Sequence, residues 1–288
     1  MTASPSSGSV HAGPRAHLVQ IASTWEDPAA NREKLLDLLD TIDPAPREGD
    51  LILLPEMFDT GFSMNLAATA DKGNATLHAL AEIAQEHRVT VQGGRTVHDC
   101  HCDRGSNTMS VVAHDAALGS RLLCEYRKVH LFTLTGEDRA IAPGTRIETY
   151  DWEFPDSGAE GGAGRDRLKV CPIICYDLRF PELFRKGLLQ GAEVFAVGAC
   201  WPAKRIHHWR ALLIARAIEN QAFVLGVTRT GSEPGVTYSG GTIAIDPTGQ
   251  VLGELGPDEG VLSVEIDPRT LRAWRGAFPA WKEHRLLS

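Results

Sequence analysis

Residues 170–185 read VCPIICYDLRFPELFR and contain the sharpest change of pattern in the chain. The apolar run that ends at Ile174 is typical of a buried strand, and polar residues follow Cys175 at once. Pro181 suits the first turn of a helix, where its missing N–H would have no partner, and Gly191 suits the end of that helix. The stretch therefore predicts a strand, a sharp turn that exposes the Cys175 thiol, and a helix.

The same alternation of strand and helix patterns extends on both sides of this stretch. Apolar runs of strand length predict strands at residues 17–22, 50–56, 89–97, 108–114, 120–126, 168–174, 192–198 and 222–228. Apolar residues at helical spacing predict helices at residues 28–42, 74–88, 181–191 and 205–221. Asp246-Pro-Thr-Gly249 predicts a turn between two further strands. We therefore expect an α/β or α+β fold.

No shift in composition divides the alternating region, so residues 17–288 are expected to form a single domain. Residues 1–16 are rich in small residues, Pro and Gly and are expected to form a disordered tail. This tail lacks the apolar core of a secretory signal. No apolar run in the chain approaches the roughly 18 residues that a membrane span needs. We therefore expect a cytoplasmic protein that does not bind membranes.

Composition and charge narrow the function classes. The chain has 288 residues, of which 43% are hydrophobic and 23% are charged, so it can bury a large core. Its formal net charge of -8 disfavours binding to nucleic-acid phosphates. Disulfide frameworks belong to small secreted proteins, so in this long chain without a signal we expect reduced thiols. The six cysteines are Cys100, Cys102, Cys124, Cys171, Cys175 and Cys200.

Three chemically reactive side chains stand where expected strands end. Glu56 lies in LILLPEMFDTGFSM, Lys128 in CEYRKVHLF and Cys175 in CPIICYDLRFPE. Because carboxyl ends of strands converge in α/β sheets, these three side chains can meet in one crevice. Taken singly, each has an ordinary interpretation, as a solvated carboxylate, a surface ammonium and a core thiol. Their order and surroundings favour a shared function.

These stretches resemble, in this chain order, the motifs of the nitrilase superfamily of carbon–nitrogen hydrolases, which use a Glu-Lys-Cys triad. The resemblance runs from about His17 to about Trp281. LPEMFDTGFSM, CYDLRFPE and RAIENQ are most similar to the ω-amidase branch, which cleaves the terminal amide of short dicarboxylic-acid monoamides. Other matching segments are GG at 93–94, SNT at 106–108, WPAKRIHHWRALLIARAIENQAF at 201–223, GGTIAIDPTGQVLGE at 240–254 and FPAW at 278–281.

The resemblance implies a four-layer αββα sandwich, a homodimer and a defined set of roles. It implies that Cys175 attacks the amide carbon, that Glu56 is the general base, and that Lys128 and the backbone N–H of Tyr176 stabilise the oxyanion. Ammonia would leave a thioester on Cys175, which water would hydrolyse. Glu137 falls where the family carries an auxiliary glutamate, although it can equally be an ordinary loop carboxylate.

Substrate recognition is less sharply predicted. An ω-amidase must hold a carboxylate at a distance from the scissile amide, and arginine suits this task because it binds carboxylates through two hydrogen bonds. Aromatic side chains can form apolar walls, although large aromatics are also ordinary core residues. The candidates for substrate binding are Phe62, Tyr126, Arg179 and Trp201, with Arg139, Arg205 and Tyr238 as further possibilities.

Two other segments suggest a metal site and a phosphate-binding loop, but neither has the complete pattern. His98, Cys100, His101 and Cys102 lie close together, but no second pair at zinc-ligand spacing follows them. The glycine-rich segment 155–167 lacks the strand-to-helix setting of a phosphate-binding loop and is interpreted as a flexible insertion. We expect no metal and no cofactor.

Two alternatives to an ω-amidase remain. One is another amidase or an N-carbamoyl hydrolase that uses the same triad on a different substrate. The other, from a different class, is a non-catalytic metal-binding or scaffold protein. The expected partners are a small-molecule amide and a second copy of the chain.

Overall fold

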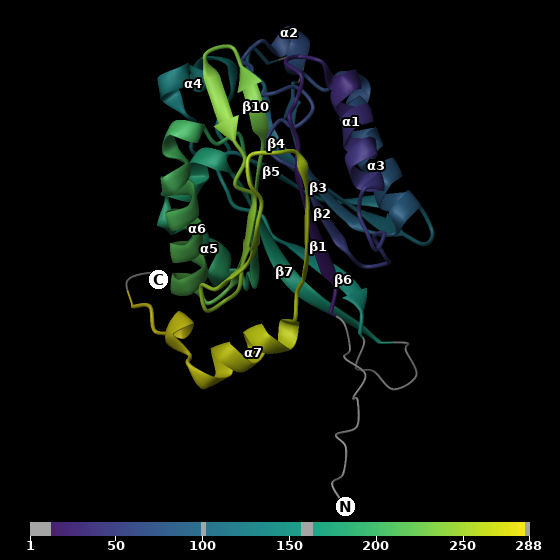
Figure 1. Cartoon of the computed structure of the whole chain (residues 1–288). Coiled ribbons are helices and arrows are strands. Elements are labelled where there is room, and N and C mark those ends of the chain that lie inside the picture. The colour runs from purple at the N-terminus through teal and green to yellow at the C-terminus, as the bar shows by residue number, and fades with distance from the viewer. Residues whose placement is uncertain (1–12, 99–101, 157–163, 286–288) are drawn as a thin grey trace, which may run out of the picture.

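The computed structural model describes residues 13–98, 102–156 and 164–285 and is drawn in Figure 1. Two six-stranded sheets pack face to face, and helices cover the outer face of each sheet. The described part of the chain is therefore an αββα sandwich, which confirms the predicted fold class. Residues 1–12 of the expected tail and residues 157–163 of the expected insertion lie outside the described residues.

The first sheet contributes one side of the site. Its order is β14–β1–β2–β3–β4–β5. β1, β2 and β3 are mutually parallel, so the residues that follow β2, including Glu56, emerge at the carboxyl edge of the sheet. Its strands are β1 (Arg15–Gln20), β2 (Leu51–Leu53), β3 (Thr90–Val97), β4 (Ser106–Asp115), β5 (Gly119–Arg127) and β14 (Gly260–Glu265).

The second sheet contributes the other side. Its order is β13–β12–β9–β8–β7–β6, and β7, β8 and β9 are parallel. Cys175 and Cys200 directly follow β7 and β8 and so leave the sheet at neighbouring strand ends. Its strands are β6 (Tyr150–Pro155), β7 (Arg165–Ile174), β8 (Val194–Ala199), β9 (Phe223–Thr228), β12 (Ile243–Ile245) and β13 (Val251–Glu254).

Four helices form the outer layers. α1 (Pro28–Asp40) and α3 (Ala75–His87) cover the first sheet, and α5 (Pro181–Leu189) and α6 (Ile206–Asn220) cover the second (Figure 1). The remaining short elements are α2 (Leu66–Thr69), α4 (Glu137–Ala140), α7 (Pro268–Ala277), the hairpin β10 (Thr230–Glu233) and β11 (Val236–Ser239), and the 3-10 helices η1 (Lys72–Asn74), η2 (Thr133–Thr135), η3 (Cys175–Arg179), η4 (Ala203–Arg205) and η5 (Ala280–Lys282). No helix in the described residues is long and apolar enough to cross a membrane.

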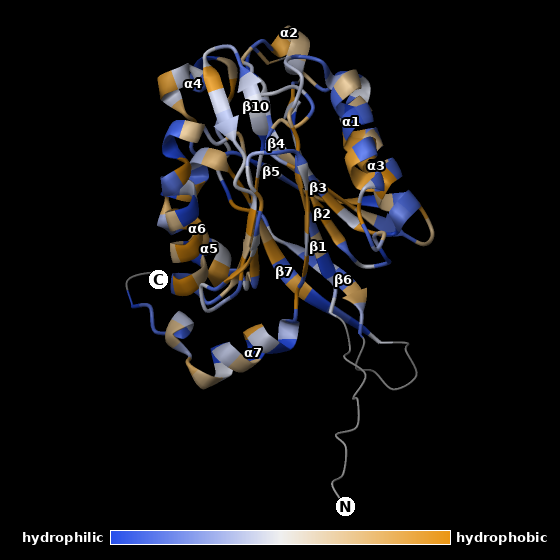
Figure 2. Cartoon of the chain, viewed as in Figure 1, coloured by the Kyte–Doolittle hydropathy of each residue, from blue (hydrophilic) through white to orange (hydrophobic). Residues whose placement is uncertain are grey.

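Strand alternation distributes the apolar side chains between the layers. Leu51 and Leu53 of β2 pack between the two sheets, whereas Ile52 packs against the side covered by α1 and α3. On the far side of the second sheet, Phe184 of α5 and Trp209 of α6 pack on the strands. Figure 2 shows hydrophobic residues along the central strands, whereas the outer helices carry both hydrophobic and hydrophilic residues.

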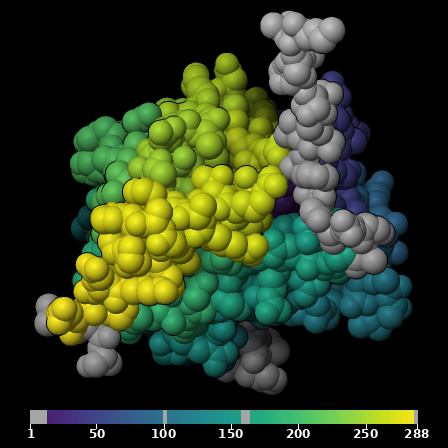
Figure 3. All heavy atoms as spheres, turned by 90° about the horizontal axis from the view of Figure 1, so that it is seen from below, coloured from purple at the N-terminus to yellow at the C-terminus, as the bar shows by residue number. Residues whose placement is uncertain are grey.

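The C-terminal segment lies across one end of the sandwich, as Figure 3 shows from below. Arg275 of α7 donates hydrogen bonds of 2.8 Å to the backbone oxygens of Gln221 and Ala192. The Gln221 side chain in turn donates to the backbone oxygen of Phe278 at 2.7 Å and accepts from the backbone N–H of Trp281 at 2.8 Å. The RAIENQ and FPAW motifs therefore hold the C-terminus against the end of α6.

The predicted elements agree with the structure except near some boundaries. The helix expected at 28–42 is α1, and the turn at Asp246–Gly249 joins β12 to β13. The strand expected at 50–56 is shorter, because β2 ends at Leu53. The expected tail reached residue 16, but β1 already begins at Arg15. The sequence did not predict β6, β10, β11, β14 or α7.

Candidate active site

Four strand ends bring the reactive groups together. Glu56 follows β2, Lys128 follows β5, Cys175 follows β7 and Cys200 follows β8. All four residues are buried, and the pKa of the Cys175 thiol responds to the charges of both Glu56 and Lys128. The structure therefore places the three residues singled out in the sequence in one cluster between the two sheets.

Lys128 lies between two carboxylates. Its Nζ is 2.8 Å from Glu56 Oε1 and 2.9 Å from each oxygen of Glu137, and none of these three side chains is exposed. Burial lowers the pKa of Lys128, but the charges of Glu56 and Glu137 outweigh it, so the pKa is raised overall. Lys128 is therefore a fixed ammonium ion. Glu137, which the sequence left open, belongs to the cluster.

Asn107 orients both carboxylates and is a residue whose role the sequence did not predict. Its Nδ2 donates to Glu56 Oε1 at 2.8 Å and to Glu137 Oε1 at 3.0 Å. The second oxygen of Glu56 accepts the backbone N–H of Cys200 at 2.9 Å. Together these bonds fix the orientation of both side chains. The available signal was the position of Asn107 in the SNT motif, at the start of an expected strand.

Cys175 is held at a strained turn. Its φ of 47° lies in the left-handed region, which non-glycine residues rarely adopt and which recurs at functional sites. The thiol is buried and lies 3.8 Å from the backbone oxygen of Cys200. Burial, followed by the negative charge of Glu56, raises the pKa of Cys175 well above its usual range, and Lys128 only partly offsets this. The resting group is thus a thiol that needs a base before it can attack.

Close backbone packing explains the GG motif. A Cβ atom added at Gly94 would lie 2.7 Å from the Glu56 Cα and 2.7 Å from the Met57 nitrogen. Met57 itself has a φ of 44°, the second left-handed non-glycine residue of the site. Only glycine at position 94 lets β3 approach this turn, which fixes where the Glu56 side chain begins.

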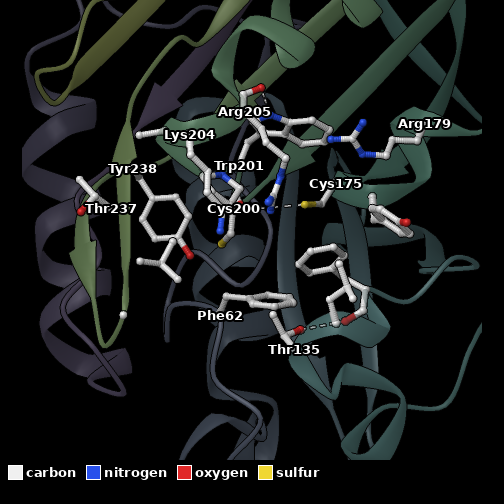
Figure 4. Close-up of a pocket in the computed structure, with 17 residues that line it drawn as sticks. Phe62, Thr135, Cys175, Arg179, Cys200, Trp201, Lys204, Arg205, Thr237 and Tyr238 are labelled. Carbon is white, nitrogen blue, oxygen red and sulfur yellow. Dashed lines mark hydrogen bonds between the residues drawn. The ribbon is translucent and has the colours of Figure 1, made fainter.

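A cavity of about 510 Å³ opens at Cys175 (Figure 4). Phe62, Phe132, Trp201 and Tyr238 supply apolar walls. The Phe62 ring centre is 5.1 Å from the Lys128 Nζ, so the ammonium lies against this wall. Trp201 is buried. Its indole N–H donates to the backbone oxygen of Arg205 at 2.8 Å.

The charged groups among the described lining residues are Arg179, Lys204 and Arg205, and no Asp or Glu lines this part of the cavity. The Arg179 guanidinium carbon is 4.9 Å from the Trp201 ring centre, and that of Arg205 is 5.2 Å from the Phe132 ring centre. Figure 4 shows both guanidinium side chains beside the cavity. This arrangement suits an anionic group on a small ligand.

Some sequence candidates lie elsewhere. Tyr126 does not line the cavity, because it is fully buried and its hydroxyl donates to Asp177 Oδ2 at 2.6 Å. The structure thus shows Tyr126 bound to Asp177, and its predicted contact with substrate stays a prediction. Arg139 is also absent from the lining, whereas Tyr238 lines it and donates its hydroxyl to Glu233. Tyr176 lines the cavity at the first turn of η3, where amides have no acceptor within the helix.

The metal hypothesis finds no support in the described residues. Cys100 and His101 lie outside them, and His98 Nε2 is 2.8 Å from the backbone oxygen of Cys102. Within the described residues, no group of three or more His, Cys, Asp or Glu side chains could hold a metal ion.

Comparison with known proteins identifies the family to which this site belongs. A model of the family described as carbon–nitrogen hydrolase matches residues 15–276. The chain belongs to the carbon–nitrogen hydrolase family. This carbon–nitrogen hydrolase is 35% identical over 246 residues to a 2-oxoglutaramate amidase of Bacillus subtilis (strain 168), which covers 85% of this chain and 88% of the relative. It is 31% identical over 268 residues to the omega-amidase YafV of Yersinia enterocolitica, covering 92% and 94% of the two chains.

A solved structure of similar fold supports the same assignment. It is the CN-hydrolase superfamily protein XC1258 of Xanthomonas campestris, which carries an arsenic adduct in its active site. The TM-score is 0.83 at 29% identity, and the match covers 96% of this chain and 98% of the other. The carbon–nitrogen hydrolase described here is therefore a nitrilase-superfamily enzyme that acts on amides.

Proposed function

We propose that this hydrolase removes the terminal amide of short dicarboxylic-acid monoamides, of the 2-oxoglutaramate or 2-oxosuccinamate type. The products would be the free acid and ammonia. The cavity is the main support for this proposal. Cys175 lines it, and the charged groups in its described lining are all cations. The names of the two similar amidases agree with this substrate class.

The first half of the proposed reaction forms a thioester. Glu56 takes the proton from the Cys175 thiol while the sulfur attacks the amide carbon. Negative charge then develops on the carbonyl oxygen, and Lys128 with the Tyr176 backbone N–H stabilises it. When the carbon–nitrogen bond breaks, Glu56 returns the proton to the leaving nitrogen. Ammonia departs and the acyl group stays on Cys175.

The second half releases the acid. A water molecule gives a proton to Glu56 and attacks the thioester carbon, and the same two donors stabilise the second oxyanion. The carbon–sulfur bond then breaks, and the proton returns from Glu56 to the Cys175 sulfur. The sum is one amide and one water consumed, and one carboxylic acid and one ammonia formed. Glu137 and Asn107 orient Lys128 and Glu56 through both steps.

The distal carboxylate is assigned to the cationic part of the cavity. Arg179 and Arg205 are both half-buried, and each lies on an aromatic ring that limits its freedom. A guanidinium held in this way loses less entropy on binding a carboxylate. Phe62 and Trp201 enclose the carbon chain between the two ends of the substrate.

Ammonia release from a substrate panel tests the proposal. The panel contains 2-oxoglutaramate, succinamate, glutamine, an N-carbamoyl amino acid and a simple nitrile, and the Cys175→Ala variant is assayed beside the wild type. Release from the first two compounds, lost in the variant, is expected. Activity that depends on Cys175 but appears only with another panel member would assign a different substrate class. Activity that survives in Cys175→Ala would refute the mechanism.

A further inference from the structure

A buried carboxylate joins the segment that carries Lys128 to the turn that carries Cys175. Asp177 Oδ2 accepts the hydroxyl of Tyr126 at 2.6 Å, and Oδ1 accepts the backbone N–H of His130 at 2.8 Å. The same Oδ1 lies 2.9 Å from His130 Nδ1. Asp177 is fully buried and its two carboxylate oxygens are bound by Tyr126 and His130, so the proposed reaction assigns it no contact with substrate.

The bonds to Asp177 lie on both sides of Lys128. Tyr126 and His130 are each two residues from Lys128, and Asp177 is two residues from Cys175. The His130 ring also stacks on the Phe180 ring, with centroids 3.6 Å apart and planes 6° apart. The hydrogen bonds to Asp177 and the stacking of His130 on Phe180 therefore hold the two segments together close to the reacting groups.

The electrostatics of this contact keep it intact. Burial, followed by the negative charge of Asp177, raises the pKa of Tyr126 well above its usual range, so the phenol remains a hydrogen-bond donor. The strained backbone of Cys175 needs such support, since left-handed non-glycine residues persist only where their surroundings hold them.

We propose that Asp177 is a positioning residue for amide hydrolysis, which holds Lys128 at the separation from Cys175 and the Tyr176 amide that the oxyanion requires. The inference rests on the proposed function, in which Lys128 and the Tyr176 N–H stabilise the oxyanion. A misplacement of roughly 1 Å in such a constellation can cost about 100-fold in rate. Arg179 lies on the same short helix as Asp177, but the contacts of the Asp177 carboxylate are with Tyr126 and His130 and not with Arg179 or Arg205, so we expect the loss to fall on kcat more than on KM.

The Asp177→Asn variant tests the inference by steady-state kinetics. The amide keeps the shape of the carboxylate but removes its charge and places an NH2 group against donors. We expect kcat to fall about 10- to 100-fold while KM changes by less than about threefold. Asp151→Asn is the control. Asp151 of β6 pairs with Lys169 of β7 at 2.7 Å, and its replacement should leave both kcat and KM unchanged. An unchanged kcat in Asp177→Asn would overturn the proposal.

Alkylation of Cys175 separates positioning from general damage to the turn. Iodoacetamide reacts with the thiol by direct displacement at carbon, which forms no oxyanion. Asp177→Asn should therefore alkylate at Cys175 within about threefold of the wild-type rate, read by peptide mass spectrometry, while its kcat falls. A loss of alkylation equal to the loss of kcat would mean that the turn itself is disordered, and would contradict a positioning role.

A double-mutant cycle with Tyr126→Phe completes the test. If Asp177 acts through Tyr126, the double variant should be no slower than Asp177→Asn alone, whereas additive losses would refute the coupling. If Asp177→Asn does not fold, Tyr126→Phe still decides, because a normal kcat in that variant would also refute it. If the wild type hydrolyses an amide outside the dicarboxylic class, the proposed substrate fails, and the same comparison on that amide still tests Asp177.

Discussion

At the scale of single residues, the site depends on the charge balance around Lys128. Two carboxyl groups, of Glu56 and Glu137, and the Lys128 ammonium form a fully buried cluster beside Cys175. In the proposed mechanism Glu56 accepts the thiol proton, and Lys128 and Asn107 hold its carboxyl group in place through Oε1. The Cys175 thiol is protonated in the resting site, because burial and the negative charge of Glu56 raise its pKa.

Replacing Lys128 by methionine tests this balance. In the proposed mechanism Lys128→Met removes the cation that stabilises the oxyanion, so kcat should fall about 100- to 1000-fold. It also leaves Glu56 and Glu137 buried without their counter-ion, which should lower the free energy of unfolding by about 3–5 kcal/mol. Ammonia release and urea unfolding measure the two effects. Lys169→Met, on a half-buried pair with Asp151, is the control and should cost no more than about 1 kcal/mol. Wild-type turnover in Lys128→Met would disprove the role.

The residues of the site differ in how far sequence could predict them. Glu56, Lys128 and Cys175 each follow an apolar run, so their placement at strand ends could be predicted. Asn107 and Asp177 could not be assigned, because each acts on a partner 51 positions away in the chain. The bond from Tyr126 to Asp177 was not predicted either, since alternation along β5 does not reveal which face of the strand meets Asp177.

At the scale of elements, the turn that follows β2 carries a second buried acid. Asp59 Oδ2 accepts the Thr76 hydroxyl at 2.6 Å, while its Oδ1 has no partner among the described residues. Burial raises the pKa of Asp59 to about 6. The folded protein therefore binds the Asp59 proton more tightly than the unfolded chain does. This tighter binding stabilises the folded protein at low pH, and the contribution is lost as the pH rises through about 6.

The Asp59→Asn variant should remove that pH dependence. The shift from 3.8 to about 6 corresponds to about 3 kcal/mol, so the variant should be more stable than wild type by up to this amount at pH 8. At pH 4, where the wild-type carboxyl is mostly protonated in the folded protein, the two should differ little. Thermal unfolding at both values checks this, with exposed Asp37→Asn as the control. Equal differences at the two pH values would contradict the assignment.

Periodicity predicted the central elements better than the peripheral ones. β8 is a continuous apolar run, and the strand expected at 192–198 lies close to its observed limits. The apolar half of β7 was also predicted, but the strand begins three residues before the expected limit, at Arg165, in a charged stretch. β6 is short and its apolar residues alternate with polar ones, and β14 is only partly buried, so neither forms the continuous apolar run by which the central strands were found. The β10–β11 hairpin is short, and Glu233 holds it by accepting hydrogen bonds from Phe62, Arg229 and Tyr238, contacts that periodicity does not reveal.

At the scale of the whole molecule, the family resemblance implies a dimer, and we propose that the α5–α6 layer forms its interface. This layer exposes Leu189 by 48% and Ile218 by 54%. The Ile218→Glu variant should be a monomer by sedimentation equilibrium at concentrations where the wild type is a dimer, because a carboxylate in an apolar interface is costly. Leu122→Glu, at a similarly exposed site on β5, should leave the dimer intact. A monomeric wild type would refute the interface.

In the proposed mechanism Cys175 forms a thioester with the acyl part of the amide. The most direct measurement is acid quenching of the enzyme during turnover of 2-oxoglutaramate, followed by peptide mass spectrometry. The proposed mechanism predicts a mass increase equal to the acyl group on the peptide that contains Cys175, and loss of both adduct and ammonia release in Cys175→Ala. An acyl group on another residue, or undiminished ammonia release in Cys175→Ala, would contradict it.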